Sequence, residues 1–188
     1  YNNTTSVIWE LPIGRGRKFL GDASPVLDAI VGGWMLSGIS FFYSGEPVTF
    51  IYAPGPTFQV SGIAQDFRGA NNYRPNVVGD PYADTGSITN YFNRDAVVIP
   101  TDPSQPFGNA ERNSVRGPKF WQVDFVAAKN FGLPFGSNTQ LQFRFEAFNL
   151  LNKTNFRAPN GNRSANAFGT ITSTYDARQL QLGVKLVF

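Results

Sequence analysis

The sequence contains no cysteine and no histidine. The absence of both residue types excludes disulfides, cysteine nucleophiles, histidine general bases, and thiolate and imidazole metal ligands. The chain also has no run of 18 or more apolar residues, which excludes a membrane-spanning helix. We therefore expect neither a metal nor another cofactor.

Charge of either sign is scarce. The 16 Lys and Arg residues outnumber the 13 Asp and Glu residues only slightly, and the charges are scattered along the chain. This balance is weak evidence for nucleic-acid binding, and we expect no nucleic-acid partner. The chain begins at Tyr1 without a signal-peptide pattern, so we expect a processed product or a piece of a longer protein.

Aromatic residues and turn formers are abundant. The 188 residues include 18 Phe, 7 Tyr and 3 Trp, together with 19 Gly and 13 Pro. This mixture disfavours long helices and favours strands joined by turns and irregular loops. The length suffices for one domain with a sizeable core if the chain folds alone.

The clearest strand is the last eleven residues, Arg178–Phe188, with the sequence R-Q-L-Q-L-G-V-K-L-V-F. Apolar and polar residues alternate, so one face of the strand is apolar and the other polar. At about 3.3 Å per residue and a tilt of about 45°, the strand rises about 26 Å, close to the apolar band of about 25 Å of an outer-membrane β-barrel. A strand of a soluble sandwich fits this segment equally well.

Four other segments show strand-like patterns, namely Asn3–Leu11, Trp34–Tyr43, Phe120–Phe131 and Thr139–Leu150. The alternation of Trp34–Tyr43 is blurred, so its two faces stay unassigned. The intervening stretches are long and irregular, and within them Ser87–Phe92 suggests one or two helical turns. Irregular stretches of this length are rare in compact soluble domains and common in the extracellular loops of large barrels.

The alternation predicts which side chains share a face. An aspartate in mid-strand is costly on a lipid face, so Asp124 should point into a wet interior, where Arg144 and Glu146 could pair with each other or with Asp124. The residues expected to line the lumen are Asp124, Gln142, Arg144, Glu146, Gln179, Gln181 and Lys185. Those expected to face lipid are Leu141, Phe143, Phe145, Leu180, Leu182, Val184 and Leu186. An ordinary solvated sheet face remains the alternative.

Two short connections complete the pattern. Pro12–Lys18, P-I-G-R-G-R-K, predicts a tight turn that lacks the Gly-Lys-Ser/Thr ending of a phosphate-binding loop. Phe19–Gly33 is expected to be a connector, and Gly132–Ser137 a second short turn. The first turn carries three cations that we expect to face solvent or lipid headgroups, Arg15, Arg17 and Lys18.

Several segments in order carry a family resemblance: E-L-P-I-G-R-G-R, G-G-W-M-L-S-G-I, Y-R-P-N-V-V-G-D-P (Tyr73–Pro81), F-G-N-A-E-R-N-S-V-R-G-P (Phe107–Pro118), V-D-F-V-A-A-K-N-F, L-Q-F-R-F-E-A-F-N-L-L-N-K-T-N-F, F-G-T-I-T-S-T (Phe168–Thr174) and the terminal strand. Together they resemble the carboxy-terminal end of TonB-dependent outer-membrane receptors. The Oar-like type, which carries a carboxypeptidase-regulatory-like domain, is the closest. The resemblance covers most of the chain and is weakest at Ile51–Asn72.

The resemblance implies an all-β fold, in which antiparallel strands form part of a transmembrane barrel of about 22 strands with long extracellular loops. It implies TonB-dependent uptake of a nutrient across the bacterial outer membrane. Residues 1–188 would be the carboxy-terminal barrel part, and the plug and earlier strands would belong to the same protein or another chain. The implied partners are outer-membrane lipid, those missing parts, TonB through the plug, and an unknown small-molecule or peptide cargo. Phe188 would be the terminus that the barrel-assembly machinery recognises.

The expected topology agrees with this resemblance. If the terminal strand ends at the periplasm, the short turns at Pro12–Lys18 and Gly132–Ser137 also fall there. The long stretches Gly45–Arg116 and Leu151–Asp176 then lie outside the cell, as in this class of barrel. About five strands cannot close a membrane barrel, which needs about eight, so strands from elsewhere must pair with this chain.

Parts of the sequence fit two other classes of function. A soluble carbohydrate-binding sandwich could use loop aromatics and acidic residues such as Asp66, Asp80 and Asp84, although no dense calcium-binding pattern is present. An enzyme could pair Asp124 with Glu146, as in glycoside hydrolysis, but two lumen-facing carboxylates explain these residues equally well, and we expect no enzyme. The aromatics that could contact cargo, or instead pack loops and membrane girdles, are Tyr43, Phe58, Tyr73, Tyr82, Tyr91 and Trp121.

Overall fold

The computed structural model describes residues 1–53, 73–102, 105–134 and 139–188. The chain forms two compact units. The sheet unit consists of Tyr1–Tyr43, Phe120–Asn155 and Asp176–Phe188, and the loop unit consists of Ser44–Lys119 and Phe156–Tyr175. Phe58 and Asp66, two of the candidate ligand-binding residues, lie outside the described residues.

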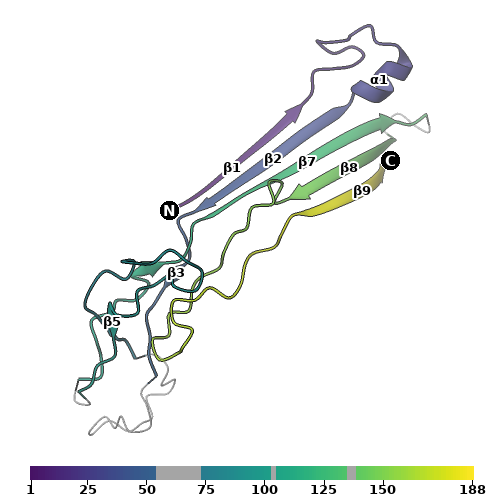
Figure 1. Ribbon diagram of the computed structural model, residues 1–188. Coiled ribbons are helices and arrows are strands. Elements are labelled where there is room, and N and C mark those ends of the chain that lie inside the picture. The colour runs from purple at the N-terminus through teal and green to yellow at the C-terminus, as the bar shows by residue number, and fades with distance from the viewer. Residues whose placement is uncertain (54–72, 103–104, 135–138) are drawn as a thin grey trace. The chain divides into compact units, whose positions relative to one another are not determined.

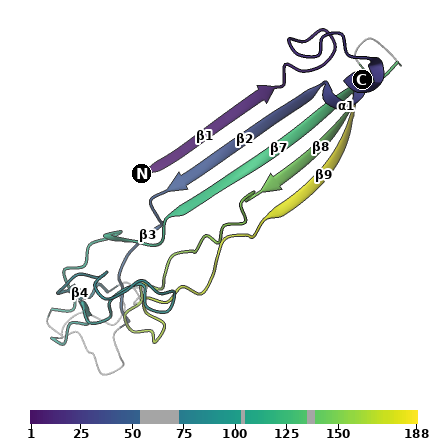
Figure 2. The same cartoon turned by 45° about the horizontal axis from the view of Figure 1, so that its top comes forward.

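The sheet unit contains one five-stranded antiparallel sheet (Figures 1 and 2). Its strands, in spatial order, are β1 (Asn2–Glu10), β2 (Trp34–Tyr43), β7 (Phe120–Gly132), β8 (Gln140–Phe148) and β9 (Gln179–Val187). All five predicted strands are confirmed, with ends within two residues of the expected bounds. Long strands with a two-residue period carry a strong local signal, which explains this agreement.

The register determines which residues share a face of the sheet. Residues opposite each other in a ladder share a face, and their side chains contact across the strands. One row across the sheet consists of Trp9, Leu36, Ala127, Phe145 and Leu182. The adjacent row, on the other face, consists of Ile8, Ser37, Val126, Glu146 and Gln181.

The connection between β1 and β2 contains a helix that the sequence analysis missed. The predicted tight turn at Pro12–Lys18 is confirmed, since the N–H of Phe19 donates to the carbonyl of Pro12 at 3.0 Å. Phe19–Gly33 connects the two strands as expected, but it also contains α1 (Pro25–Val31), which was not predicted. The Ser24 hydroxyl accepts the N–H of Leu27, and a proline at the first position preorganises the helix.

The helix packs closely on the turn that precedes it. Gly14 has a φ of +121°, and a Cβ there would lie 2.5 Å from the carboxylate of Asp28 and 2.7 Å from the Cα of Gly32. The same carboxylate accepts the backbone N–H of Arg15 at 2.6 Å. No helix among the described residues is long and apolar enough to cross a membrane.

The second predicted turn, Gly132–Ser137, is described only in part. The N–H of Leu133 donates to the carbonyl of Thr139 at 2.9 Å, which closes the connection between β7 and β8. Residues 135–138 lie outside the described part of the chain. We call the end of the sheet where these two connections lie the turn-side end. The opposite end, where β2 stops and β7 begins, is called the loop-side end.

The loop unit is built from short pairings rather than long strands. β3 (Pro47–Val48) pairs with β6 (Val115–Arg116), and β4 (Asn76–Val77) pairs with β5 (Val97–Val98). Two-residue strands are too short to show a period, so no local pattern predicts them.

The helical turns expected at Ser87–Phe92 are wrong. Ser87 and Asn90 form an isolated antiparallel bridge across a tight turn. The Ser87 hydroxyl also accepts the N–H of Asn90 at 2.9 Å. Such side-chain-to-backbone hydrogen bonds compete with helix formation.

An aromatic core holds the loop unit together. The Phe50 ring is fully buried and lies 5.0 Å, edge to face, from that of Phe92 and 5.5 Å from that of Phe168. Val48, Val97, Ala110 and Val115 complete the buried cluster. Phe168 comes from the second segment of the unit, so the contact joins regions far apart in the sequence.

Candidate functional site

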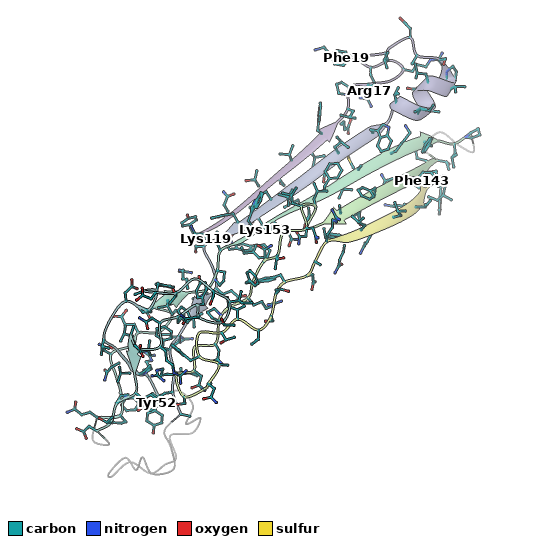
Figure 3. The ribbon with its side chains drawn as sticks, in the orientation of Figure 1. Arg17, Phe19, Tyr52, Lys119, Phe143 and Lys153 are labelled. Atoms are coloured by element: carbon teal, nitrogen blue, oxygen red, sulfur yellow. The ribbon has the colours of Figure 1, made fainter. Side chains whose placement is uncertain are left out.

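The apolar face of the sheet is continuous and exposed. The seven residues predicted to face lipid share this face, since the register pairs Leu141 with Leu186, Phe143 with Val184, Phe145 with Leu182 and Ala147 with Leu180. Leu182 is 86% exposed and Val184 is 65% exposed, and Figure 3 marks Phe143 on β8. A contiguous exposed apolar surface of this kind is covered by a membrane or a partner.

Aromatic residues lie at both ends of the apolar face. Phe42 and Trp121 are directly paired at the loop-side end, and Trp34 and Phe131 lie at the turn-side end. Trp121 and Phe131 share a face of β7 and are ten residues apart. That separation corresponds to a rise of about 23 Å for a tilt of about 45°. This separation matches the spacing that two interfacial aromatic girdles would have.

The loop-side girdle residue Trp121 is tied to the end of the sheet. The backbone N–H of Trp121 donates to the side-chain amide oxygen of Asn155 at 3.0 Å. The side-chain amide nitrogen of Asn155 donates to the backbone carbonyl of Trp121 at 2.9 Å. The Lys153 ammonium lies 5.2 Å from the Trp121 ring, and Figure 3 labels Lys153 in the sheet unit. An aromatic ring beside a cation suits the membrane–water interface.

The opposite face carries the predicted lumen residues. The register places all seven of them on one side of the sheet: Asp124, Gln142, Arg144, Glu146, Gln179, Gln181 and Lys185. Arg144 pairs with Glu146 at 2.7 Å, and its side chain is 42% exposed. A pair this exposed contributes about 0.2–1 kcal/mol. That one face looks into a lumen and the other into lipid remains a prediction.

Asp124 has a structural role at the loop-side end of β8. Its carboxylate accepts the amide N–H of Gln122 at 2.7 Å and the backbone N–H of Asn149 at 2.9 Å. Asn149 is almost fully buried and has a φ of +52°, and its amide oxygen accepts the N–H of Lys153 at 3.0 Å. Of the two pairings that the sequence left open for Arg144, the structure contains the one with Glu146, and Asp124 instead fixes the strand end.

Lys129 is the one charged residue on the apolar face of β7. The sequence analysis did not assign it to a face. It pairs with Trp34 on β2 and Phe143 on β8, both apolar, and it is 6% exposed. Its ammonium donates to the carbonyl of Gly32 and lies 5.3 Å from the Trp34 ring and 4.9 Å from the Phe131 ring. The sequence contains a signal for this placement, because Lys129 stands two residues from both Ala127 and Phe131 and therefore shares their face.

The loop aromatics that were candidates for cargo contact are engaged in packing. Tyr73 is buried, and its ring stacks on that of Phe107 at 5.4 Å. The Tyr82 hydroxyl accepts the N–H of Arg116 at 2.7 Å and donates to its carbonyl at 3.0 Å. Tyr91 lies edge to face with Phe92 at 5.3 Å. These contacts support the loop-packing interpretation for the three tyrosines.

Other candidate positions lie in both units. In the sheet unit, the Tyr43 ring lies 5.2 Å from that of Phe120. In the loop unit, Asp80 accepts the N–H of Tyr82 at 2.9 Å. Within the described residues no three or more acidic side chains come together as a metal site would require. Phe188 follows β9 and is 95% exposed, so its predicted part in barrel assembly is sterically possible.

Tyr52, which is buried, and Tyr91, which is partly buried, predict an alkaline loss of stability of the loop unit. Burial raises the pKa of Tyr52, and Tyr73 raises it further; burial and Tyr82 raise the pKa of Tyr91. The unfolded phenols ionise near about pH 10, so above this pH the folded state binds more protons than the unfolded state. The free energy of unfolding of the loop unit is therefore unaffected by these groups below about pH 10 and falls above it.

Limited proteolysis at about pH 8 and about pH 10.5 measures this loss. We expect faster cleavage within Ser44–Lys119 at the higher pH. Tyr52→Phe should weaken the dependence of the cleavage rate on pH. It should also lower the free energy of unfolding at neutral pH by about 0.5–1.5 kcal/mol, because the hydrogen bond to the Pro106 carbonyl is lost. Equal cleavage rates at both pH values would contradict the raised pKa values of Tyr52 and Tyr91.

These features together define a class of protein. A single antiparallel sheet with one exposed apolar face, a second face that carries charged and amide side chains, and aromatic residues at both ends is the wall of a β-barrel that spans the outer membrane. A family model described as outer membrane beta barrel domain matches residues 1–181, and the chain belongs to this family. The protein is thus located in the bacterial outer membrane. No curated protein and no solved structure matches the chain.

Membership of this family contradicts the alternative of a soluble sandwich. A sandwich buries the apolar face of each sheet against a second sheet. Here the apolar residues of β9 are exposed, and the sheet unit has a single sheet among its described residues. Both facts agree with a barrel wall.

Proposed function

We propose that this chain is the carboxy-terminal part of an Oar-like TonB-dependent receptor, which takes up a nutrient across the outer membrane and has no enzymatic activity. The observation that carries the proposal is the ordered series of segments that resemble this receptor type, from Glu10–Arg17 to Arg178–Phe188. Membership of the outer membrane beta barrel domain family agrees with it.

The open sheet supports the need for further strands. Among the described residues, β1 and β9 each pair with one neighbour only. An unpaired strand edge in lipid leaves backbone groups unsatisfied at several kcal/mol each. We propose that strands of the same protein or of another chain pair with β1 and β9, and that a plug within the closed barrel contacts TonB.

The connections support an orientation. At the turn-side end, a short turn joins β7 to β8, and the Pro12–Lys18 turn together with α1 joins β1 to β2, whereas the loop unit interrupts the chain between β2 and β7 and again between β8 and β9. Because barrels of this class have short periplasmic turns and long external loops, we place the turn-side end in the periplasm. The loop unit then faces the medium and is the part that meets a small-molecule or peptide cargo.

A semi-native gel of the source outer membrane tests the barrel, with an antibody to Phe168–Phe188. We expect a band that shifts on boiling and that runs, when unfolded, at several times the 20.7 kDa of this chain. A boiled band near 20.7 kDa would assign the remaining strands to another chain. A heat-insensitive band in the soluble fraction would contradict the barrel itself.

TonB dependence needs a separate measurement. We expect the detergent-extracted barrel to bind the purified periplasmic domain of TonB, and to lose this binding when the first residues of its plug are deleted. A folded, heat-modifiable barrel that binds no TonB would contradict TonB-dependent uptake and leave the outer-membrane assignment intact.

A further inference from the structure

A buried lysine on a surface that otherwise meets lipid requires an explanation. The Lys129 side chain is 6% exposed, on the apolar face at the turn-side end. A cation there is costly unless it has partners. Gly32 provides one carbonyl acceptor, and the rings of Trp34 and Phe131 provide two aromatic faces. An ammonium has three donors, so among the described residues one hydrogen-bond partner leaves capacity for a ligand.

An apolar groove opens beside Lys129 on the same sheet. Its volume is about 540 Å³. Side chains of four strands contribute to it, including Trp34 of β2, Phe143 and Phe145 of β8, and Leu182 of β9. The register accounts for the hollow, because the small Ala127 stands between Leu36 and Phe145 in its row. An extended hydrocarbon chain fits a groove of this lining.

A polar pocket adjoins the groove. Its volume is about 290 Å³, and Lys129 and Phe131 line both spaces. Arg15 and Asp28 also line the pocket, so two basic residues and one acidic residue surround it. Lys129 and Arg15 carry two positive charges against the one negative charge of Asp28, so the lining has an excess of positive charge for an anion.

We propose that this surface binds one phospholipid, with an acyl chain in the groove and the phosphate in the pocket between Lys129 and Arg15. A cationic pocket joined to an apolar groove matches the two halves of such a lipid, and charge-assisted hydrogen bonds from Lys and Arg are the usual ligands of phosphate. The position beside the turn-side aromatic girdle is the depth of lipid headgroups. The inference is independent of TonB and of any cargo.

The test uses the complete barrel that contains this chain, extracted in detergent and freed of lipid. Native mass spectrometry titrates it with dioleoyl phosphatidylglycerol and, separately, with dioleoyl glycerol, which lacks the phosphate. We expect Lys129→Met to weaken phosphatidylglycerol binding at least about tenfold and to leave the binding of dioleoyl glycerol unchanged. Lys129→Arg, which keeps the charge, should bind as the original protein does.

Lys185→Met is the matched control, because Lys185 lies on β9 on the opposite face of the sheet. It should not change lipid binding. Arg15→Gln provides a second test that spares the fold, since the Arg15 side chain is exposed and only its backbone binds Asp28. It should weaken phosphatidylglycerol binding several-fold.

Three outcomes would overturn the proposal. Equal phosphatidylglycerol affinities for the original protein, Lys129→Met and Arg15→Gln would remove the role of the cations. An equal loss in Lys185→Met would mean a general charge effect. Mass spectra of a dimer that excludes lipid, and that Ala127→Phe dissociates by filling the groove, would assign the surface to a second copy of the chain.

Discussion

Leu182→Arg should destabilise the folded barrel by about 2–4 kcal/mol, because it places a cation near the middle of the lipid-facing surface. Leu182 lies in the central part of β9 and pairs with Phe145, in a row that is apolar across the whole sheet. This change in free energy reduces the folding equilibrium constant about 30- to 700-fold. Urea titration of the barrel refolded into phospholipid vesicles, read by the heat-dependent gel shift, measures it.

Gln181→Arg is the matched control, one residue away on the other face. Gln181 lies opposite Glu146, so the new cation gains a carboxylate neighbour and should change stability by less than about 0.5 kcal/mol. If the apolar face met water instead, the exposed Leu182 would tolerate arginine equally well. Similar results for the two variants would therefore contradict the assignment of the faces.

Phe50→Ala should destabilise the loop unit by about 3–5 kcal/mol. The Phe50 ring is fully buried between those of Phe92 and Phe168, and its removal leaves a cavity that these rigid rings cannot fill. The loss exceeds that of any other substitution suggested for this unit. We expect cleavage by protease within Ser44–Lys119 at concentrations that leave the original protein intact.

Phe107→Ala is the control for this effect. Phe107 belongs to the same unit and stacks on Tyr73, but it is 59% exposed. Its removal should cost about 0.5–1.5 kcal/mol, the value of an aromatic pair. Equal protease sensitivity of Phe50→Ala and Phe107→Ala would mean that the aromatic cluster is not the core of the unit. The heat-dependent gel shift of the barrel should persist in both.

The sheet and its two faces were predictable because their signals are local. In a strand, parity alone assigns each side chain to a face, so Leu180 and Gln181 were separated correctly from the sequence. Sequence also predicted the turn at Pro12–Lys18, since glycine is required where φ is positive, as at Gly14.

Other features had signals that were outweighed or absent. The seven-residue helix α1 carries a Ser-Pro start, but it is too short for a full amphipathic period. At Ser87–Asn90 the predicted helical turns do not form, and the Ser87 hydroxyl accepts the N–H of Asn90 in a tight turn instead. Which carboxylate pairs with Arg144 depends on side-chain rotamers, and periodicity contains no information on these.

By itself the sequence determined that this is an all-β chain with five long amphipathic strands, because period-two alternation is written into neighbouring residues. Only the tertiary structure decided how the irregular stretches pack, because Phe50 and Phe168 meet across more than a hundred intervening residues. It also decided the surroundings of Lys129, where the carbonyl of Gly32 and two aromatic rings from different elements converge. Long-range contacts of this kind follow from the whole fold, and no local pattern encodes them.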